Sequence, residues 1–251
     1  MVSWTFSALI SFQNGYNLQI KDKPFTIEKH PFKIKIDQHP SENAWRLDLT
    51  YENDIEDRDL VINNARNEIS KIVNLISWSQ NIPIRNWRIT SIVFTRGNNK
   101  SVEIINQRII VFDNIILAKT LGSSSLESLR QTIMRNYNEE ITEILSMYTE
   151  AQSETSKPLK FLLFYRILEK LHGNRKGADN YIINWHNNRN KPIEMKASRG
   201  QVTIFTFLRD NIHPKDESRY FPYNEIIRYL PTLTEIARQS IAEKYEELAN
   251  I

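Results

Sequence analysis

Arg209 and His213 are the residues whose types and spacing best suit chemistry on a phosphate group. The apolar residues around them keep helical spacing up to Pro214, which predicts a short helix: Ile204, Phe205, Phe207, Leu208 and Ile212. Because residues four apart share a helix face, a guanidinium and an imidazole are expected to project together from its last turn. Such a pair can hold a phosphate and move a proton. The alternative is structural, since an Arg and a His near a helix C-terminus also stabilise the helix dipole.

The segment from Lys170 to Arg199 is a second candidate surface. It holds seven Lys or Arg residues against Asp179 and Glu194, so its formal charge is +5. Its basic side chains are predicted to contact RNA phosphates: Arg175, Lys176, Arg189, Lys191, Lys196 and Arg199. Trp185 lies among them and is expected to stack on bases. The alternative is a solvated, basic connection between two helices.

Composition narrows the classes of protein and site that the chain can form. The 251 residues are 40% hydrophobic, which suffices for one large or two small domains with a hydrophobic core. The absence of cysteine excludes disulfides, thiolate zinc sites and Cys nucleophiles. Gly-rich phosphate loops and metal-ligand spacings are also missing, so we expect no metal and no cofactor. With neither an export signal nor a membrane-spanning apolar run, a cytoplasmic protein is expected.

The first half of the chain alternates apolar and polar residues with the period of β-strands. Asn14-Gly15 suits a tight turn, so residues 3–20 are predicted to form a β-hairpin. Residues 57–78 instead carry an apolar stripe at helical spacing and are predicted to form one long helix on the sheet. Further strands are predicted at 32–36, 45–51, 87–95 and 101–105, and, with an interruption, at 109–117. Residues 1–122 are therefore predicted to form an α+β domain, mainly antiparallel β with one long helix.

The second half, residues 123–251, has helical periodicity and is predicted to form an all-α domain. Ser124 and Glu127 have the spacing of a capping box, which opens a helix that runs to about residue 148. A helix over 158–171 is apolar nearly all round and is expected to be central in the bundle. Its charged residues Arg166 and Glu169 are expected either to pair with each other, three positions apart, or to bond to a neighbouring polar site, for which the helix that carries Arg209 is the natural neighbour. Pro231 is predicted to separate two final helices.

Two stretches of this half resemble a known family: Phe164-Tyr165-Arg166-Ile167-Leu168-Glu169 and Leu208-Arg209-Asp210-Asn211-Ile212-His213. They resemble HEPN-superfamily domains, in particular the HEPN-like domains of bacterial conflict proteins and the methylamine-utilisation J-like group, over about residues 124–250. The resemblance implies a helical bundle that dimerises, in a bacterial antiviral setting, and whose active members are metal-independent ribonucleases. Arg209, Asp210 and His213 match the residues of that ribonuclease motif by type. One residue fewer separates the Arg from the His than in the usual pattern.

Two functions follow from the resemblance. In the first, the protein is a metal-independent endoribonuclease: Arg209 holds the phosphate oxygens, His213 moves the proton of the RNA 2′-hydroxyl, and Asp210 and Glu169 orient the pair. In the second, the helical half is catalytically inactive and binds a partner protein or RNA in a larger defence assembly. The expected partners are RNA and either a second copy of the chain or a larger complex, with no membrane.

Overall fold

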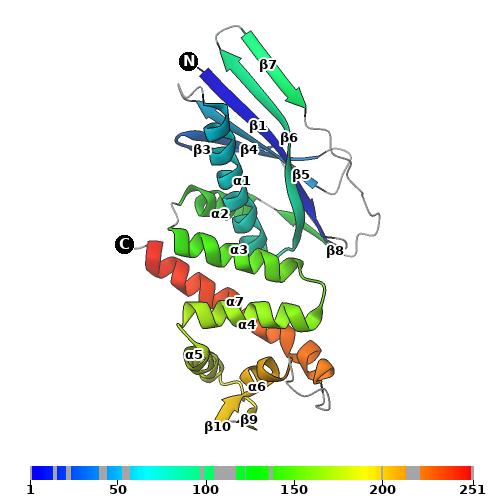
Figure 1. Cartoon of the computed structure of the whole chain (residues 1–251), viewed down its shortest axis with the longest axis vertical. Helices are drawn as coiled ribbons and strands as arrows, with labels where there is room; N and C mark the ends of the chain where they lie inside the picture. The colour runs from blue at the N-terminus through cyan, green and yellow to red at the C-terminus, as the bar shows by residue number, and fades with distance from the viewer. Residues whose placement is uncertain are drawn as a thin grey trace. The chain divides into compact units, whose positions relative to one another are not determined.

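The computed structural model of the chain divides into two compact units, Met1–Asn136 and Tyr137–Ile251 (Figure 1). It describes residues 2–13, 16–20, 24–39, 44–52, 57–96, 99–104, 117–121, 123–135, 138–198, 200–212 and 221–249. The first unit holds a six-stranded antiparallel sheet and the second is mainly helical, so the fold is α+β, as predicted. Within the described ranges, no helix combines the length and the apolar character that crossing a bilayer requires.

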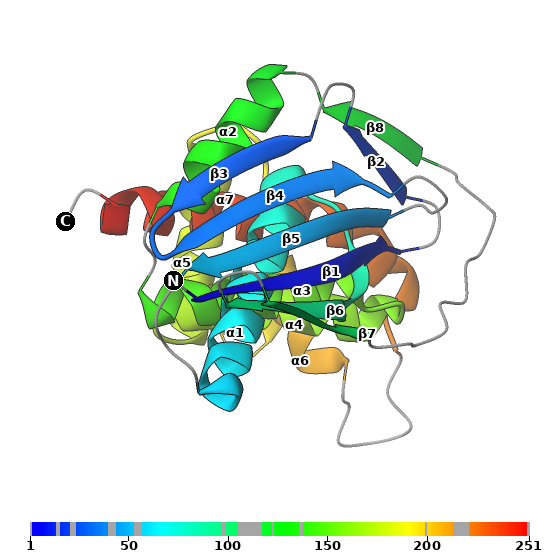
Figure 2. The ribbon, with the colours of Figure 1, turned by 90° about the horizontal axis from the view of Figure 1, so that it is seen from above.

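The sheet of the first unit has the strand order β3-β4-β5-β1-β6-β7, and all neighbouring strands are antiparallel. Its strands are β1 (Val2–Phe12), β3 (Phe25–Lys29), β4 (Phe32–Gln38), β5 (Ala44–Glu52), β6 (Ile84–Arg96) and β7 (Asn99–Ile104). On β1, Trp4 and Phe6 are buried while Thr5 between them is partly exposed, as the alternation of the sequence requires. The strands contact α1 (Arg58–Gln80), which Figure 2 shows behind the sheet.

The helix α1 is capped at both ends by residues of its own sequence. Asp57 caps its N-terminus, and the Asp57 carboxylate accepts hydrogen bonds from the backbone N–H groups of Asp59 and Leu60, each at 3.1 Å. The buried stripe repeats at helical spacing: Val61, Ala65, Ile69, Ile72, Val73 and Ile76. The helix ends at Asn81, whose φ of 53° is left-handed. The helix predicted over 57–78 is therefore confirmed.

The hairpin predicted over residues 3–20 is wrong. β2 (Tyr16–Ile20) pairs in parallel with β8 (Leu117–Leu121) in a separate two-stranded sheet. The cause is non-local, because β5 and β6 occupy the two edges of β1 and leave no edge for β2. The predicted turn at Asn14-Gly15 and most of the strand predicted at 109–117 lie outside the described residues.

The second unit is built around α4 (Lys157–Leu171), which contacts four other helices. These are α3 (Glu139–Ser153), α5 (Arg175–Asn187), α6 (Ile204–Asn211) and α7 (Tyr223–Ala249). A short antiparallel ribbon of β9 (Met195–Ser198) and β10 (Gly200–Thr203) precedes α6, and the sequence patterns did not predict it. The buried residues of α4 are Phe161, Phe164, Tyr165, Ile167 and Leu168, and they confirm its predicted central place.

The helix predicted from residue 126 to 148 is two helices, because α2 (Ser123–Met134) ends before α3 begins. Asn138 caps the new helix, and the Asn138 side chain accepts a hydrogen bond from the backbone N–H of Ile141 at 2.9 Å. α2 belongs to the first unit, where it contacts α1 and β3. The division between the units therefore falls one helix later than the predicted boundary after residue 122.

The break predicted at Pro231 is also wrong, since α7 runs through this proline. A proline inside a helix costs about 3 kcal/mol, whereas burying one Leu or Ile side chain contributes about 1.5–3 kcal/mol. Buried residues continue at helical spacing on both sides of the proline: Ile226, Leu230, Leu233, Ile236, Ala237 and Ile241. Their combined burial outweighs the cost of the proline.

We predict that the first unit depends on α2 for its stability. Leu129 and Ile133 of α2 are fully buried, and each contributes about 1.5–3 kcal/mol when removed from water. A fragment of residues 1–122 should therefore unfold at a lower urea concentration than a fragment of residues 1–136, as measured by circular dichroism. Equal midpoints for the two fragments would contradict the prediction.

Candidate functional site

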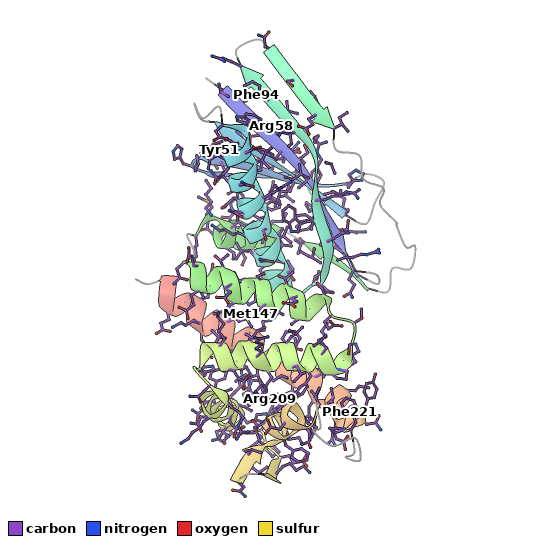
Figure 3. The ribbon with its side chains drawn as sticks, viewed as in Figure 1. Tyr51, Arg58, Phe94, Met147, Arg209 and Phe221 are labelled. Atoms are coloured by element: carbon purple, nitrogen blue, oxygen red, sulfur yellow. The ribbon has the colours of Figure 1, made fainter. Side chains whose placement is uncertain are left out.

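Three of the residues predicted for catalysis lie in one ion-pair network. Arg209 Nη2 donates to Glu169 Oε1 at 2.9 Å, and Arg209 Nη1 donates to Asp210 Oδ1 at 2.9 Å. Arg175, which was predicted to bind RNA, donates from Nη1 to Asp210 Oδ2 at 2.8 Å. We call these four residues the Arg209 network, and Figure 3 labels Arg209 in the helical unit. The structure thus brings Arg209, Asp210 and Glu169 together, as the sequence predicts.

A polar cluster fixes α6 against α4 and α5. Thr203 caps α6, and Asp179 of α5 accepts hydrogen bonds from the Thr203 backbone N–H at 3.2 Å and hydroxyl at 2.5 Å. Asp179 also accepts from the Thr206 hydroxyl at 2.5 Å, and the Tyr165 hydroxyl of α4 lies 2.7 Å from the same oxygen of Thr206. Burial raises the pKa of Tyr165, so its phenol stays protonated and can donate. These bonds hold in place a helix of eight residues, which is too short to be stable alone.

The charges of the Arg209 network are balanced, with two guanidinium groups and two carboxylates. Burial lowers the pKa of Arg209, but the hydrogen bond to Asp210 and the charge of Glu169 outweigh it, so the pKa is raised overall. The exposed fraction of the side chain is 36% for Arg209, 22% for Glu169 and 23% for Asp210. An anion that approaches Arg209 therefore meets a cation that two carboxylates already neutralise.

His213 and Arg199 lie outside the described residues. The described chain of this region ends at Ile212, whose backbone is right-handed helical. The structure therefore does not test the pairing of Arg209 with His213, which stays a prediction.

Trp185 is placed differently from its predicted role. It lies on α5 with 3% of its surface exposed, and its Nε1 donates to Gln239 Oε1 at 3.1 Å. The guanidinium of Arg189 lies 4.2 Å from the ring centre and also donates to Gln239, while Lys191 Nζ lies 5.4 Å from the ring centre. The indole therefore offers no free face to a base, which corrects the predicted stacking role.

The basic segment is partly neutralised by carboxylates. Lys196 pairs with Glu194 at 2.5 Å, and Lys170 pairs with Glu143 of α3 at 2.5 Å. Lys176 and Lys191 are exposed, the first at the start of α5 and the second beyond its end. The segment is also not one loop, because α5 occupies residues 175–187. Those of the predicted phosphate-binding residues that the structure describes thus do not share one unpaired cationic surface.

A pocket of about 520 Å³ lies between α6, α7 and the residues around β9. Its apolar lining is Ile204, Phe207, Leu208 and Pro222, and its polar lining is Glu194, Lys196, Asn211, Glu225, Arg228 and Tyr229. We call it the α6–α7 pocket. The sequence does not predict this pocket, because the apolar spacing of α6 shows which of its residues are buried but not which side chains of α7 lie opposite them.

The polar side of the pocket has one satisfied carboxylate and one with an unsatisfied oxygen. Glu194 Oε2 accepts from the Tyr229 hydroxyl at 2.6 Å. Hydrogen bonds from Lys196 and Tyr229 lower the pKa of Glu194, and the bond to Glu194 raises the pKa of Tyr229. By contrast, Glu225 Oε2 is enclosed and accepts no hydrogen bond within the described part of the chain.

His172 provides a pH-dependent contribution to the stability of the second unit. Its Nε2 lies 2.9 Å from the Ser240 hydroxyl, and its ring stacks on Tyr181 with the ring centres 4.2 Å apart. Burial lowers the pKa of His172 from its ordinary value of 6.5. The unfolded chain therefore binds the proton more readily than the folded chain, and stability falls as the pH drops below 6.5.

We predict that His172→Gln makes the urea midpoint of the second unit less dependent on pH between 7.5 and 5.5. Gln cannot titrate but retains a group that can hydrogen-bond to Ser240. The control is His30→Gln, at an exposed histidine of the first unit, which should leave this dependence unchanged. A wild-type midpoint that rises on acidification would contradict the sign of the prediction.

Comparison of the chain with protein-family models, with curated proteins and with solved structures finds no match. The resemblance to HEPN domains therefore rests on the motif residues of the sequence. The function has to be argued from the geometry of the Arg209 network and of the surfaces around it.

Proposed function

We propose that the second unit is a HEPN-like helical module that binds a partner protein and does not cut RNA. The observation that carries the proposal is the bonding of Arg209 to both Glu169 and Asp210. A phosphate would have to replace these two charge-assisted hydrogen bonds. It would also meet the repulsion of the two carboxylates. In this module, Arg209 joins α6 to α4 as a structural residue.

The outer surface of α7 supports the binding of a protein. Tyr223 and Ile227 lie one turn apart on this helix, with 46% and 44% of their surfaces exposed. Phe221, labelled in Figure 3 next to the start of α7, is 37% exposed. Large apolar side chains that gather on an exposed surface are typical of interaction sites. The partner is either a second copy of this chain or another protein, and the antiviral setting follows from the resemblance.

Ribonuclease activity is the second candidate, and one observation favours it. Arg209, four residues before His213 in the sequence, keeps about a third of its side chain exposed on the last turn of α6, and two carboxylates fix its orientation. A guanidinium held in this way is preorganised if its partners yield to a phosphate. The RNA 2′-hydroxyl would then be the nucleophile, His213 would move its proton, and the products would carry cyclic phosphates.

Cleavage of labelled RNA separates the two functions. We predict that the purified chain gives no product in EDTA, with either the wild type or Arg209→Ala. Metal-independent products with cyclic phosphate ends that disappear in His213→Ala would overturn the proposal and establish the ribonuclease.

The structural role of Arg209 gives a further prediction. Arg209→Ala should lower the free energy of unfolding by about 1 kcal/mol, because Glu169 loses the guanidinium that faces it and Asp210 keeps only Arg175. The matched control is Arg166→Ala, at an exposed arginine of the same central helix α4, which should change stability little. Thermal unfolding of both variants measures the difference. Equal losses in the two variants would contradict the structural role.

The molecular mass of the protein in solution shows whether the partner is a second copy of the chain. We expect light scattering to give twice the chain mass if the partner is a second copy, and Ile227→Asp should then return the protein to one chain mass. This change places a charge on the apolar surface of α7, which an interface excludes. A single-chain mass for the wild type at high micromolar concentration would remove the homodimer and leave another protein as the partner.

A further inference from the structure

The α6–α7 pocket and the Arg209 network lie on different faces of one helix. Ile204, Leu208 and Asn211 line the pocket and have the spacing of one helix face. Arg209 and Asp210 are bonded to α4 and α5 and do not line the pocket. The pocket is therefore separate from the Arg209 network.

The pocket has the size and the lining of a site for an organic ligand. Its volume of about 520 Å³ lies within the range of roughly 300–1,000 Å³ that such sites occupy. Ile204 and Leu208 are almost fully buried and therefore fixed in place, and Phe207 beside them gives the apolar wall a partly exposed side chain. A wall of this kind favours an aliphatic stem over a small polar molecule.

The charged side chains that line the pocket indicate the charge of the ligand group that would bind beside the apolar wall. Glu194 is bonded by Lys196 and Tyr229, and these partners satisfy it. Glu225 differs, since among the described residues it forms no ion pair and its Oε2 accepts no hydrogen bond. A carboxylate oxygen that is shielded from water without a donor carries a desolvation cost, which a ligand N–H group relieves once the carboxylate turns toward it.

The pocket lining has two cations, Arg228 and Lys196, and each contacts a group other than Glu225. The guanidinium of Arg228 lies over the ring of Tyr229, 5.4 Å from its centre, and Lys196 is held by Glu194. Both cations are thus engaged with other groups of the rim. Among the described residues, neither of these cations forms an ion pair with Glu225.

We propose that the α6–α7 pocket binds an organic cation with an aliphatic stem, an alkylammonium or alkylguanidinium whose charged end pairs with Glu225. The stem lies along Phe207, and the cation donates to the Glu225 carboxylate. A free amine and the side chain of a lysine or arginine in another protein share this chemistry, because both have an apolar stem and a charged end.

The test uses three probes of equal chain length with the full chain: n-hexylamine, n-hexanol and hexanoate. Binding is followed by NMR chemical-shift titration. The amine should bind at least about tenfold more tightly than the alcohol, since it adds a charge-assisted hydrogen bond. Glu225→Gln should abolish this preference, and the control Glu235→Gln, at an exposed carboxylate of α7 outside the pocket, should retain it.

Two further binding experiments test the proposal if Glu225→Gln destabilises the first turns of α7. Arg228→Gln removes a cation of the rim and should tighten the binding of the amine, whereas a binder of anions would weaken. Nα-acetyl-lysine amide, titrated beside n-hexylamine, separates the sources: binding of both points to a side chain of another protein, and binding of the amine alone points to a free amine. Equal affinity for the amine and the alcohol, or tighter binding of hexanoate, would overturn the proposal.

Discussion

The docking of α6 onto α4 and α5 is the constraint on which the second unit depends. Asp179, Thr203, Thr206 and Tyr165 satisfy one another in a largely buried cluster, where an unpaired polar group would cost about 1–3 kcal/mol. Because every member has a partner, the cluster fixes both the position and the rotation of α6. That rotation directs Arg209 toward Glu169 and turns the opposite side of the helix toward α7. The Arg209 network and the α6–α7 pocket are therefore two consequences of one packing arrangement.

Two kinds of feature could be predicted from the sequence. The first are elements set by local periodicity, and the second is the pairing of a charged side chain on a central helix. The apolar stripe of α1 is local, and the structure has this helix where the sequence places it. The ion pair between Glu169 and Arg209 joins residues forty positions apart, and it is one of the two kinds of partner that the sequence allowed for Glu169, because a charged group on a central helix requires an opposite charge. The rule that a buried charged group needs a partner therefore links residues that are too far apart in the sequence for periodicity to connect.

The features that could not be predicted depend on competition between distant segments. The alternation of Tyr16–Ile20 and the Asn14-Gly15 turn describe a hairpin, but β5 and β6 take both edges of β1. Proline ordinarily ends a helix, but α7 continues through Pro231 because the helices around it bury its apolar stripe on both sides of the proline. Trp185 shows the same limit, since its burial depends on α7, which supplies Gln239. Likewise, the pocket exists only because Glu225 and Tyr229 of α7 stand opposite α6.

Charge counted along the sequence also differs from charge counted in space. The stretch from Lys170 to Arg199 is basic by composition, but carboxylates outside it engage two of its cations, Glu143 at Lys170 and Asp210 at Arg175. Arg189 is held against Trp185 and Gln239, where its stem and plane serve packing as well as charge. A surface that binds RNA through counterion release needs several cations free of such partners. The pairing of these side chains within the bundle therefore favours a module that recognises its partners by apolar contact and a few directed charges over one that follows a phosphate backbone.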